Sequence, residues 1–555
     1  MSISIALGQI NTTIGDFAGN LERIRGVVQR ARESGADLVV IPELALSGYP
    51  PMDLLERPRF LRNQAAALEA LAAESREIAL VVGAILPAPA GRPRPIVNAA
   101  VALAGGEIAH VQPKTLLPTY DVFDEARYFE PASERRPWSF RGHRIGLTVC
   151  EDIWSGKFWG PSRPYPVDPV EECVQAGADL IVTVSASPFE QRKIGLRDEM
   201  LQDAARLHGV PVVFCNLVGG NDELVFDGSS FVVDREGRIV ERLARFEEDF
   251  AVVDPFQRSR PEAQAVEPDI ELLERALVLG IRDYLGKLRL DRSVIALSGG
   301  IDSAVTATLA SRALGPEKVL GLLMPGPFSS EHSLTDAQAL VENLGIEGRT
   351  VRIDSVYKTF LETYRDLFGQ AESYGITQEN LQARARGTIL MSVSNYEGHI
   401  VLATGNKSEL SVGYTTLYGD LVGGLAVIGD VLKRDVYRLA RYANRERKTI
   451  PQNTIDKPPS AELAPDQRDT DTLPPYEVLD EILAQVVEEG RPADEIEPPA
   501  GASADTVRWV LQQIDRNEYK RRQAPIVLRV SRKAFGTGRR IPIAHRTDWG
   551  SRGPT

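Results

Sequence analysis

The chain has 555 residues, of which 43% are hydrophobic and 25% are charged, and its formal net charge is −13. A chain of this length is expected to form about two to four domains with cores that need no disulfides or metals. The acidic balance argues against non-specific binding to nucleic acid or to anionic membranes. The three cysteines fit neither a disulfide framework nor a zinc site, and neither a signal peptide nor a membrane-spanning stretch is evident. We therefore expect a cytoplasmic protein.

The first half of the chain alternates apolar runs with helical patterns. Residues 3–10 are a short apolar run, residues 20–36 carry apolar side chains at helical spacing, and residues 36–46 are again apolar. This β-α-β opening is followed by further runs that are apolar at nearly every position, as in strands covered on both faces. The pattern predicts a layered α/β domain over residues 1–255.

A polar, proline-bearing stretch separates this half from a second series of elements. We interpret residues 256–269 as a linker, because strands and helices then alternate again from residue 271 onward. This alternation predicts a parallel sheet with right-handed crossovers in a second domain, residues 270–555. The segment 456–475 is rich in Pro, Asp and Thr, which fits either a mobile loop near an active site or solvated surface.

Three reactive side chains in the first domain each follow an apolar run. Glu43 ends the run LVVIPE, Lys114 follows HVQP, and Cys150 ends GLTVC. Side chains at strand ends of an open α/β sheet point into the crevice where ligands bind. A carboxylate, an ammonium and a thiol converging there would supply a base, an oxyanion stabiliser and a nucleophile for attack on an amide.

The local sequences around these three residues resemble the catalytic segments of the nitrilase superfamily. The segments are VIPELALSGYP, PKTLLPTYDVFDEARYF and TVCEDIW, and they occur in the expected order. The resemblance implies an α-β-β-α sandwich in which Glu43 is the general base, Lys114 stabilises the tetrahedral intermediate and Cys150 is acylated. It also implies that Glu125 orients either Lys114 or the substrate.

Two further segments are similar to the glutaminase branch of this superfamily, which is fused to NAD⁺ synthetases. They are YDVFDEARYF and SASPFEQRK. The resemblance implies that Tyr120, Ser187 and Lys193 bind L-glutamine.

The second domain carries the sequence SGGIDS between an apolar strand and an Ala-rich helix. Two adjacent glycines let successive backbone N–H groups point into one concavity, and the helix N-terminus adds positive potential that suits phosphate. The loop lacks the GK[ST] of a Walker A motif. Its residues are the candidate ATP-binding groups: Ser298, Gly299, Gly300, Ile301, Asp302 and Ser303.

SGGxDS is the signature of the ATP pyrophosphatase family, and the chain is identified as a member of it on these residues. The resemblance implies a doubly wound parallel sheet and transfer of AMP from ATP to a substrate. It also implies that Asp302 helps to hold Mg²⁺, which favours carboxylate and phosphate oxygens. An acidic residue is also favoured at a helix N-terminus, and the two roles are compatible.

Segments further along resemble NAD⁺ synthetases within that family. They are ITQENLQARARGTILM, LATGNKSELSVGYTTLYGD and NEYKRRQAP. The resemblance implies that Asn380, Glu409 and Lys520 contact deamido-NAD⁺, that Glu409 is also a Mg²⁺ ligand, and that Thr404 binds ATP.

Together these resemblances imply a homo-oligomeric enzyme that uses deamido-NAD⁺, Mg-ATP and L-glutamine to make NAD⁺. Three alternatives stay open at this point. One is another amidotransferase of the ATP pyrophosphatase type, such as a GMP synthetase, whose glutaminase usually relies on a Cys–His–Glu triad. Here no His lies near Cys150 in a matching motif, although His143 is seven residues upstream. The others are a non-enzymatic nucleotide-binding regulator and a carbon–nitrogen hydrolase with an unrelated appendage.

Overall fold

The chain folds into two compact units, Met1–Val266 and Glu267–Thr555. The structure, a computed structural model, describes residues 2–154, 165–191, 193–257 and 267–547. Within the predicted linker, residues 258–266 lie outside the described residues, and helix α5 begins at Asp269. Among the described helices, none has both the length and the apolar character needed to cross a membrane.

The first sheet of unit 1 has the order β14-β1-β2-β3-β4-β5. Its strands are β1 (Ile5–Gln9), β2 (Leu38–Val40), β3 (Ala79–Pro87), β4 (Ile96–Ala104), β5 (Glu107–Pro113) and β14 (Asp249–Val253). The central strands β1, β2 and β3 are parallel, while β14, β4 and β5 join as antiparallel strands.

The second sheet of unit 1 has the order β13-β12-β9-β8-β7-β6. Its strands are β6 (Trp138–Phe140), β7 (His143–Val149), β8 (Leu180–Ser185), β9 (Val212–Asn216), β12 (Phe231–Val233) and β13 (Ile239–Arg242). Strands β7, β8 and β9 are parallel. A separate antiparallel pair is formed by β10 (Val218–Asn221) and β11 (Leu224–Asp227).

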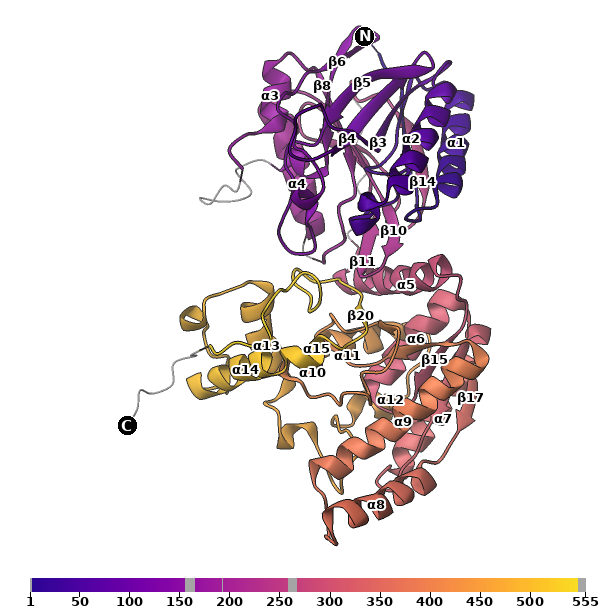
Figure 1. Ribbon diagram of the computed structural model, residues 1–555, viewed down its shortest axis with the longest axis vertical. Coiled ribbons are helices and arrows are strands. Elements are labelled where there is room, and N and C mark those ends of the chain that lie inside the picture. Colours follow the sequence, from indigo (N-terminus) through magenta and orange to yellow (C-terminus); the bar gives the residue numbers. More distant parts are fainter. Residues whose placement is uncertain (1, 155–164, 192, 258–266, 548–555) are drawn as a thin grey trace. The chain divides into compact units, whose positions relative to one another are not determined.

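Unit 1 is layered as helix, sheet, sheet, helix. Figure 1 shows α1 (Phe17–Glu33) and α2 (Pro58–Glu74) beside one sheet, and α3 (Pro169–Gln175) and α4 (Lys193–His208) beside the other. Apolar side chains from both sheets, such as Leu7 and Leu147, share one buried core between them. A further core lies between the first sheet and its helices, and another lies between the second sheet and its helices. The predicted α-β-β-α sandwich is therefore confirmed.

Unit 2 contains a parallel sheet of six strands in the order β17-β16-β15-β18-β19-β20. The strands are β15 (Ser293–Ala296), β16 (Val319–Leu323), β17 (Glu347–Thr350), β18 (Ile400–Ala403), β19 (Leu425–Ala426) and β20 (Ile526–Val527). Chain order reverses between β15 and β18, which makes their carboxyl ends the topological switch point where ligands bind in such sheets. The predicted doubly wound sheet is confirmed.

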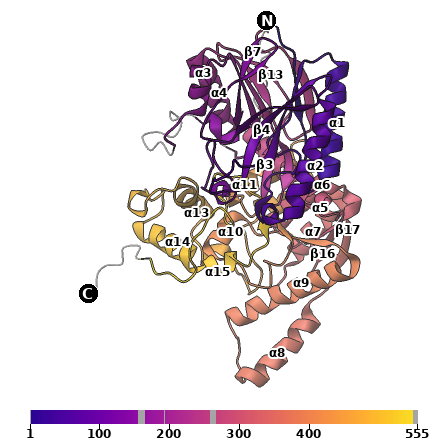
Figure 2. The same ribbon diagram turned by 45° about the horizontal axis from the view of Figure 1, so that its top comes forward.

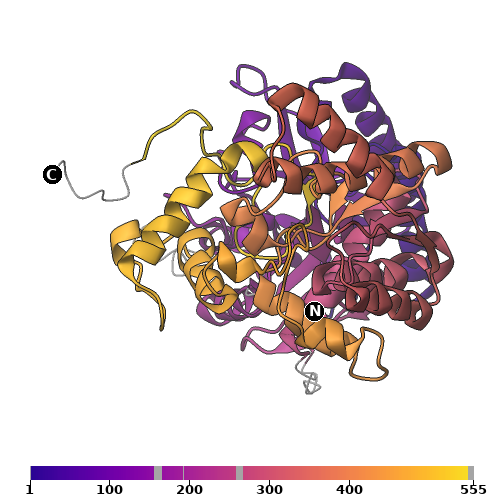
Figure 3. The same cartoon turned by 90° about the horizontal axis from the view of Figure 1, so that it is seen from below.

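The helices of unit 2 fall into three groups, which Figures 2 and 3 show from two further directions. The first group is α5 (Asp269–Lys287), which precedes β15, and α6 (Ile301–Leu314) and α7 (Glu331–Leu344), which connect β15 to β16 and β16 to β17. Helices α8 (Asp354–Phe368) and α9 (Ile376–Glu397) lie side by side as a hairpin. The later helices are α10 (Lys407–Val412), α11 (Lys433–Ala443), α12 (Gln452–Asp456), α13 (Tyr476–Leu483), α14 (Ala504–Arg516) and α15 (Glu518–Arg521).

Two candidate active sites

The structure of unit 1 brings the predicted base and ammonium into direct contact. The Lys114 Nζ lies 2.9 Å from Glu43 Oε1 and 2.8 Å from Glu125 Oε1. Glu43 follows β2, Lys114 follows β5, and Cys150 follows β7 at the first position of a short 3-10 helix, η3 (Cys150–Ile153). All four side chains are buried, and the charges of Glu43 and Lys114 both act on the Cys150 thiol.

The Glu43 carboxylate is fixed by donors from two other strands. Its Oε1 accepts from Asn98 Nδ2 at 2.7 Å, and its Oε2 accepts from the backbone N–H of Ala186 at 2.9 Å. Strand β3 passes very close, since a Cβ on Gly83 would lie 2.4 Å from the Glu43 Cα. Only glycine at this position lets the sheet approach Glu43 so closely.

Glu125 completes a chain of buried polar groups. Its Oε1 accepts from Lys114 and, at 2.8 Å, from the hydroxyl of Tyr49. Burial raises the pKa of Glu125 although Lys114 opposes the shift, whereas the carboxylates of Glu125 and Glu43 raise the pKa of Lys114 despite its burial. Lys114 therefore stays cationic, as a stabiliser of a developing oxyanion must.

Cys150 is held in a strained turn. Its φ is 45°, a value that non-glycine residues seldom adopt and that often marks a functional position. Burial raises the pKa of the Cys150 thiol to about 12, and the Glu43 carboxylate adds to the rise. At neutral pH the thiol is therefore protonated, so nucleophilic attack requires a base to remove the proton.

Asp152 ties this turn to the segment that carries Lys114. Its Oδ1 accepts from the backbone N–H groups of Thr115 at 2.9 Å and Leu116 at 2.7 Å, and its Oδ2 accepts from Val149 N–H at 3.1 Å. One buried carboxylate thus fixes the ends of β5 and β7 relative to each other.

The predicted glutamine-binding residues lie near Cys150 and the residue that follows it, Glu151. Tyr120 donates to both oxygens of Glu151, at 2.9 and 3.0 Å. Ser187 follows β8, is buried, and has no partner for its hydroxyl among the described residues. Lys193 begins α4, and its ammonium lies 5.2 Å from the Trp154 ring centroid and acts electrostatically on Glu151.

Glu151 was not predicted as a site residue. It is 3% exposed and also accepts from the Tyr165 hydroxyl at 3.1 Å. Burial raises its pKa, while Lys114, the tyrosine hydroxyls and Lys193 oppose the shift. Its position directly after the nucleophile was the available signal, but an acidic residue there is also common at the start of a helix.

His143 is placed at the wrong end of its strand for a Cys–His triad. Strand β7 (His143–Val149) has seven residues, so at about 3.3 Å per residue it separates His143 from Cys150 by roughly 20 Å. The imidazole lies 3.0 Å from Asp179 and stacks on Phe256. His143 therefore cannot serve as the histidine of a Cys–His–Glu triad with Cys150.

In unit 2 the SGGIDS loop lies at the topological switch point. It follows β15 and leads into α6, which begins at Ile301. Gly299 has φ +79°, and a Cβ there would lie 2.2 Å from the Ser333 carbonyl oxygen. The tight turn and the close approach of α7 both require glycine, which leaves the backbone N–H groups at the start of α6 available for phosphate.

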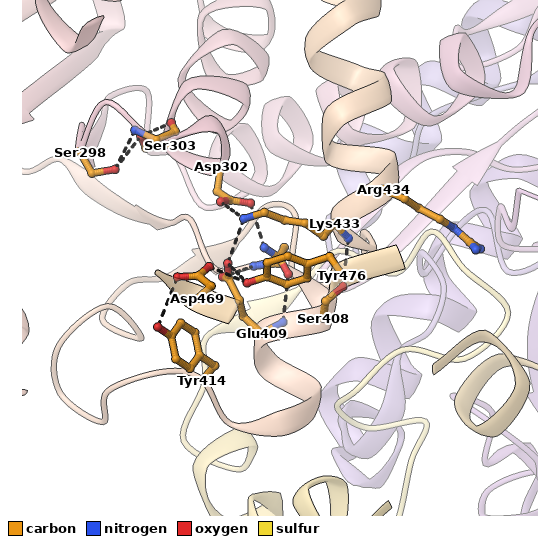
Figure 4. Close-up of polar contacts among 12 residues, drawn as sticks. Ser298, Asp302, Ser303, Ser408, Glu409, Tyr414, Lys433, Arg434, Asp469 and Tyr476 are labelled. Atoms are coloured by element: carbon orange, nitrogen blue, oxygen red, sulfur yellow. Dashed lines mark hydrogen bonds and ion pairs between the residues drawn. The ribbon is translucent and has the colours of Figure 1, made fainter. Parts of the chain in front are cut away.

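Asp302 and Glu409 converge on one ammonium, as Figure 4 shows. The Lys433 Nζ lies 2.5 Å from Asp302 Oδ2 and 3.1 Å from Glu409 Oε1. Asn406 caps α10 and donates to Asp302 Oδ1 at 2.9 Å. Burial raises the pKa of Glu409 even though Lys433 opposes the shift, and the two carboxylates raise the pKa of Lys433.

The donor set fits a magnesium ion that is shared with a nucleotide. Among the described residues, no group of three or more His, Cys, Asp or Glu side chains is arranged to hold a metal by itself. Mg²⁺ in nucleotide sites is usually held by one or two carboxylates together with phosphate oxygens. Asp302 and Glu409 already share one cationic partner, so they can supply two such carboxylates.

The other predicted residues of unit 2 lie around α10. Thr404 follows β18 at the switch point. Asn380 accepts from the Thr416 hydroxyl at 2.7 Å, and the Lys520 Nζ donates to the carbonyls of Gly413 and Thr415 at 2.7 and 2.8 Å. Asn380 and Lys520 therefore meet the same turn, directly after the helix that carries Glu409.

Sequence reasoning missed Lys433, Asp469 and Tyr476. The Tyr476 hydroxyl donates to Asp469 at 2.8 Å and lies 3.5 Å from Glu409, and the Lys433 ammonium lies 5.0 Å from the Tyr476 ring centroid. Asp469 belongs to the segment 456–475, so this part of the segment lies at the site rather than on solvated surface. No local motif marks these residues, because they reach the site from distant parts of the sequence.

Comparison with known proteins identifies both units. The family model described as Carbon-nitrogen hydrolase matches residues 4–256, and the one described as NAD synthase matches residues 273–524. A protein named Glutamine-dependent NAD(+) synthetase from Synechocystis sp. is 45% identical over 552 residues, covering 98% of this chain and 98% of its own. One of the same name from Thermotoga maritima is 42% identical over 583 residues, covering 98% and 99%.

Two solved structures agree over the whole chain. The glutamine-dependent NAD⁺ synthetase from Acinetobacter baumannii, in complex with ADP, is 36% identical with a TM-score of 0.77, and the match covers 98% of both chains. The synthetase from Cytophaga hutchinsonii is 20% identical with a TM-score of 0.82, again over 98% of both chains. The latter supports the fold alone.

Proposed function

The chain belongs to the family of glutamine-dependent NAD⁺ synthetases, and from this premise we propose the residues that carry its reaction. The reaction is the ATP-dependent amidation of deamido-NAD⁺ to NAD⁺ with ammonia from L-glutamine, which releases glutamate, AMP and pyrophosphate. The observation that carries the assignment is the presence in one chain of a buried Glu43–Lys114–Cys150 cluster and a phosphate loop beside Asp302 and Glu409.

In the glutaminase unit, Glu43 takes the proton of Cys150 as the thiolate attacks the side-chain amide of glutamine. The Lys114 ammonium stabilises the oxyanion of the tetrahedral intermediate, and Glu125 holds that ammonium in place. Glu43 passes this proton to the amide nitrogen, and ammonia leaves a thioester on Cys150. Water then attacks the thioester while Glu43 accepts a proton from it, and this proton returns to the Cys150 sulfur as glutamate leaves.

Glutamine is oriented by charge as well as by shape. Glu151 is a buried carboxylate next to the nucleophile, and it suits the α-ammonium of the substrate, with Tyr120 holding it in position. Lys193 and the Ser187 hydroxyl supply the positive charge and the donor that an α-carboxylate requires.

In the synthetase unit, the nicotinate carboxylate of deamido-NAD⁺ attacks the α-phosphate of ATP, and pyrophosphate leaves. The acyl-adenylate then reacts with ammonia to give the amide and AMP. The loop Ser298–Ser303 and Thr404 bind ATP, while Asn380, Glu409 and Lys520 contact deamido-NAD⁺. The relative from Acinetobacter baumannii is in complex with ADP, which supports an adenine-nucleotide site in this chain.

Asp302 and Glu409 would hold Mg²⁺, which neutralises charge on the phosphates when it is bound. The Lys433 ammonium pairs with the same two carboxylates, so it adds positive charge where phosphate oxygens would bind.

The enzyme acts as a homo-oligomer in this proposal. Helix α8 leaves apolar side chains in solvent: Val356 is 38% exposed, Phe360 44%, Leu367 69% and Phe368 60%. Exposed apolar clusters of this kind mark association surfaces. Light scattering of the purified chain, compared with Phe360→Glu, tests this point, and a wild-type monomer at micromolar concentration would contradict it.

The central experiment compares nitrogen sources. NAD⁺ formation from deamido-NAD⁺ and Mg-ATP is measured with glutamine or with ammonium chloride, for the wild type, Cys150→Ala and the control Cys173→Ala. We expect Cys150→Ala to lose only the glutamine-driven reaction and Cys173→Ala to keep both. If the wild type makes no NAD⁺ from either source, the substrate assignment is wrong. Glutamine hydrolysis at full rate without ATP and deamido-NAD⁺ would instead favour a hydrolase with an unrelated second unit.

A further inference from the structure

One continuous helical segment contacts three successive residues of the acid-bearing turn in unit 2. The segment is α13 (Tyr476–Leu483), which continues as the π-helical turn η7 (Ala484–Glu488). Its side chains contact consecutive residues of α10 in reverse order. The Tyr476 hydroxyl lies 3.5 Å from Glu409 Oε1, and Asp480 Oδ1 lies 2.5 Å from the Ser408 Oγ. Glu488 Oε1 lies 2.8 Å from the Lys407 Nζ.

The π turn explains how all three side chains can share one face. Tyr476 and Asp480 are four residues apart and lie on the same side of an α-helix. A continuous α-helix would turn Glu488 about 80° away from Asp480, since each residue advances about 100° around the axis. The π turn takes up one extra residue and brings Glu488 back to that face.

Asp480 is the central contact of this face. Asp480 and Ser408 are fully buried. One carboxylate oxygen of Asp480 accepts from the Ser408 hydroxyl, and the other accepts from the backbone N–H of Arg434 at 2.8 Å. The Ser408 Oγ in turn accepts from the backbone N–H of Lys433 at 3.0 Å.

These bonds provide acceptors for the backbone N–H groups in the first turn of α11, and the acceptors come from other helices. Leu432 precedes α11 and makes no side-chain cap, so the N–H groups of Lys433 and Arg434 depend on Ser408 and Asp480. The same Ser408 is the immediate neighbour of Glu409 on α10. Figure 4 shows Ser408 beneath Lys433, next to the ion pairs that Lys433 makes.

We propose that Asp480 is a positioning residue for the amidation reaction, which holds Glu409 and Lys433 at their working separation through Ser408 and the first turn of α11. The inference rests on the proposed function of this site. The observation that carries it is that Asp480 bonds both to Ser408, the neighbour of Glu409 on α10, and to the first turn of α11, which carries Lys433.

The test uses the full-length chain with ammonium chloride as the nitrogen source, so that the glutaminase site plays no part. The variants are Asp480→Asn, Ser408→Ala and the double variant. The control is Glu477→Gln, which changes an exposed acid on the same helix. For Asp480→Asn we expect kcat to fall by about tenfold or more, as for a lost hydrogen bond to a charged group. The KM for deamido-NAD⁺ should change less than kcat does, because two of its three proposed contacts, Asn380 and Lys520, do not depend on Asp480.

A double-mutant cycle separates positioning through Ser408 from a general loss of stability. If Asp480 acts through Ser408, the double variant should have about the same kcat as the less active of the two single variants. Losses that multiply, or an Asp480→Asn variant as active as Glu477→Gln, would overturn the inference. If Asp480→Asn does not fold, Ser408→Ala decides alone: at a temperature where its melting curve shows it still folded, it should show the same fall in kcat, and an unchanged kcat overturns the inference. A wild type without ammonium-driven activity would overturn the proposed function as well.

Discussion

The charge balance around Lys114 leads to a quantitative prediction for Lys114→Met. The ammonium lies between Glu43 and Glu125, and the exposed fractions of the three side chains are 1%, 0% and 6%. Methionine fills much of the same space without the charge, so two buried carboxylates lose their cationic partner. Breaking a buried pair in this way costs about 3–5 kcal/mol when the remaining charge stays ionised.

The cost should depend on pH because Glu125 can take up a proton. Burial already raises the pKa of Glu125, and Lys114 opposes that shift, so its removal raises the pKa of Glu125 further. A group whose pKa is raised by folding stabilises the protein at low pH, and this contribution is lost as pH rises through the folded pKa. The stability difference between the variant and the wild type should therefore shrink as pH is lowered from 8 to 5.5.

Hydrogen–deuterium exchange of the full-length chain is the suitable assay, since a chain of two units need not unfold in one step. Peptides from β2 and β5 should exchange about 100-fold faster or more at pH 8 in Lys114→Met, because 1.4 kcal/mol corresponds to a factor of about ten. Peptides from unit 2 provide an internal reference, and Arg23→Met, which removes an exposed charge from the same unit, is the control variant. A loss of protection below about fivefold, or one equal at pH 5.5 and 8, would refute the reasoning. Glutamine hydrolysis should fall at least about 100-fold in the same variant.

Three further predictions concern the nucleophile and its supports. Because burial raises the pKa of Cys150 to about 12, its alkylation by iodoacetamide in the substrate-free protein should speed up about tenfold per pH unit between pH 7 and 9, followed at this residue by mass spectrometry. Asp152→Asn replaces one of two acceptor oxygens with a donor, so glutamine-driven NAD⁺ formation should fall about tenfold or more while the ammonium-driven reaction is unchanged. Gly83→Ala would place a Cβ 2.4 Å from the Glu43 Cα, so it should abolish glutamine hydrolysis, whereas a Cβ on Gly26 meets nothing within 4 Å and Gly26→Ala should be fully active.

The sequence was sufficient for the architecture because the strands are buried on both faces. Runs such as residues 79–85 are apolar at nearly every position, and the structure places them in sheets covered by helices or by a second sheet. Strand ends could be predicted for the same reason, since a reactive side chain directly after an apolar run must lie at the edge of a sheet. This is why the structure brings Glu43 and Lys114 together with Cys150.

The residues that could not be predicted act over long sequence distances. Lys433 meets Asp302 across a separation of 131 residues, and Asp480 meets Ser408 across 72. In both cases the local sequence is that of an ordinary amphipathic helix. Whether Lys433 or Asp480 is buried, and which residue it contacts, is therefore decided only by the packed structure. The roles of the predicted substrate-binding residues likewise depend on ligands, and they remain predictions.

Both candidate sites contain one lysine between two carboxylates, but the carboxylates differ in their exposure to solvent. Lys114 lies between Glu43 and Glu125, and Lys433 lies between Asp302 and Glu409, so each cluster carries a net charge of −1 when all three groups are ionised. In the first cluster both carboxylates are nearly sealed, at 0% and 6% exposure, which leaves no room for a hydrated metal ion but suits the proton transfers proposed for Glu43. In the second they are 19% and 16% exposed, which leaves room for a hydrated cation and phosphate oxygens. The same triad of charges thus suits a general base where it is closed to solvent, and a metal–nucleotide site where it is open.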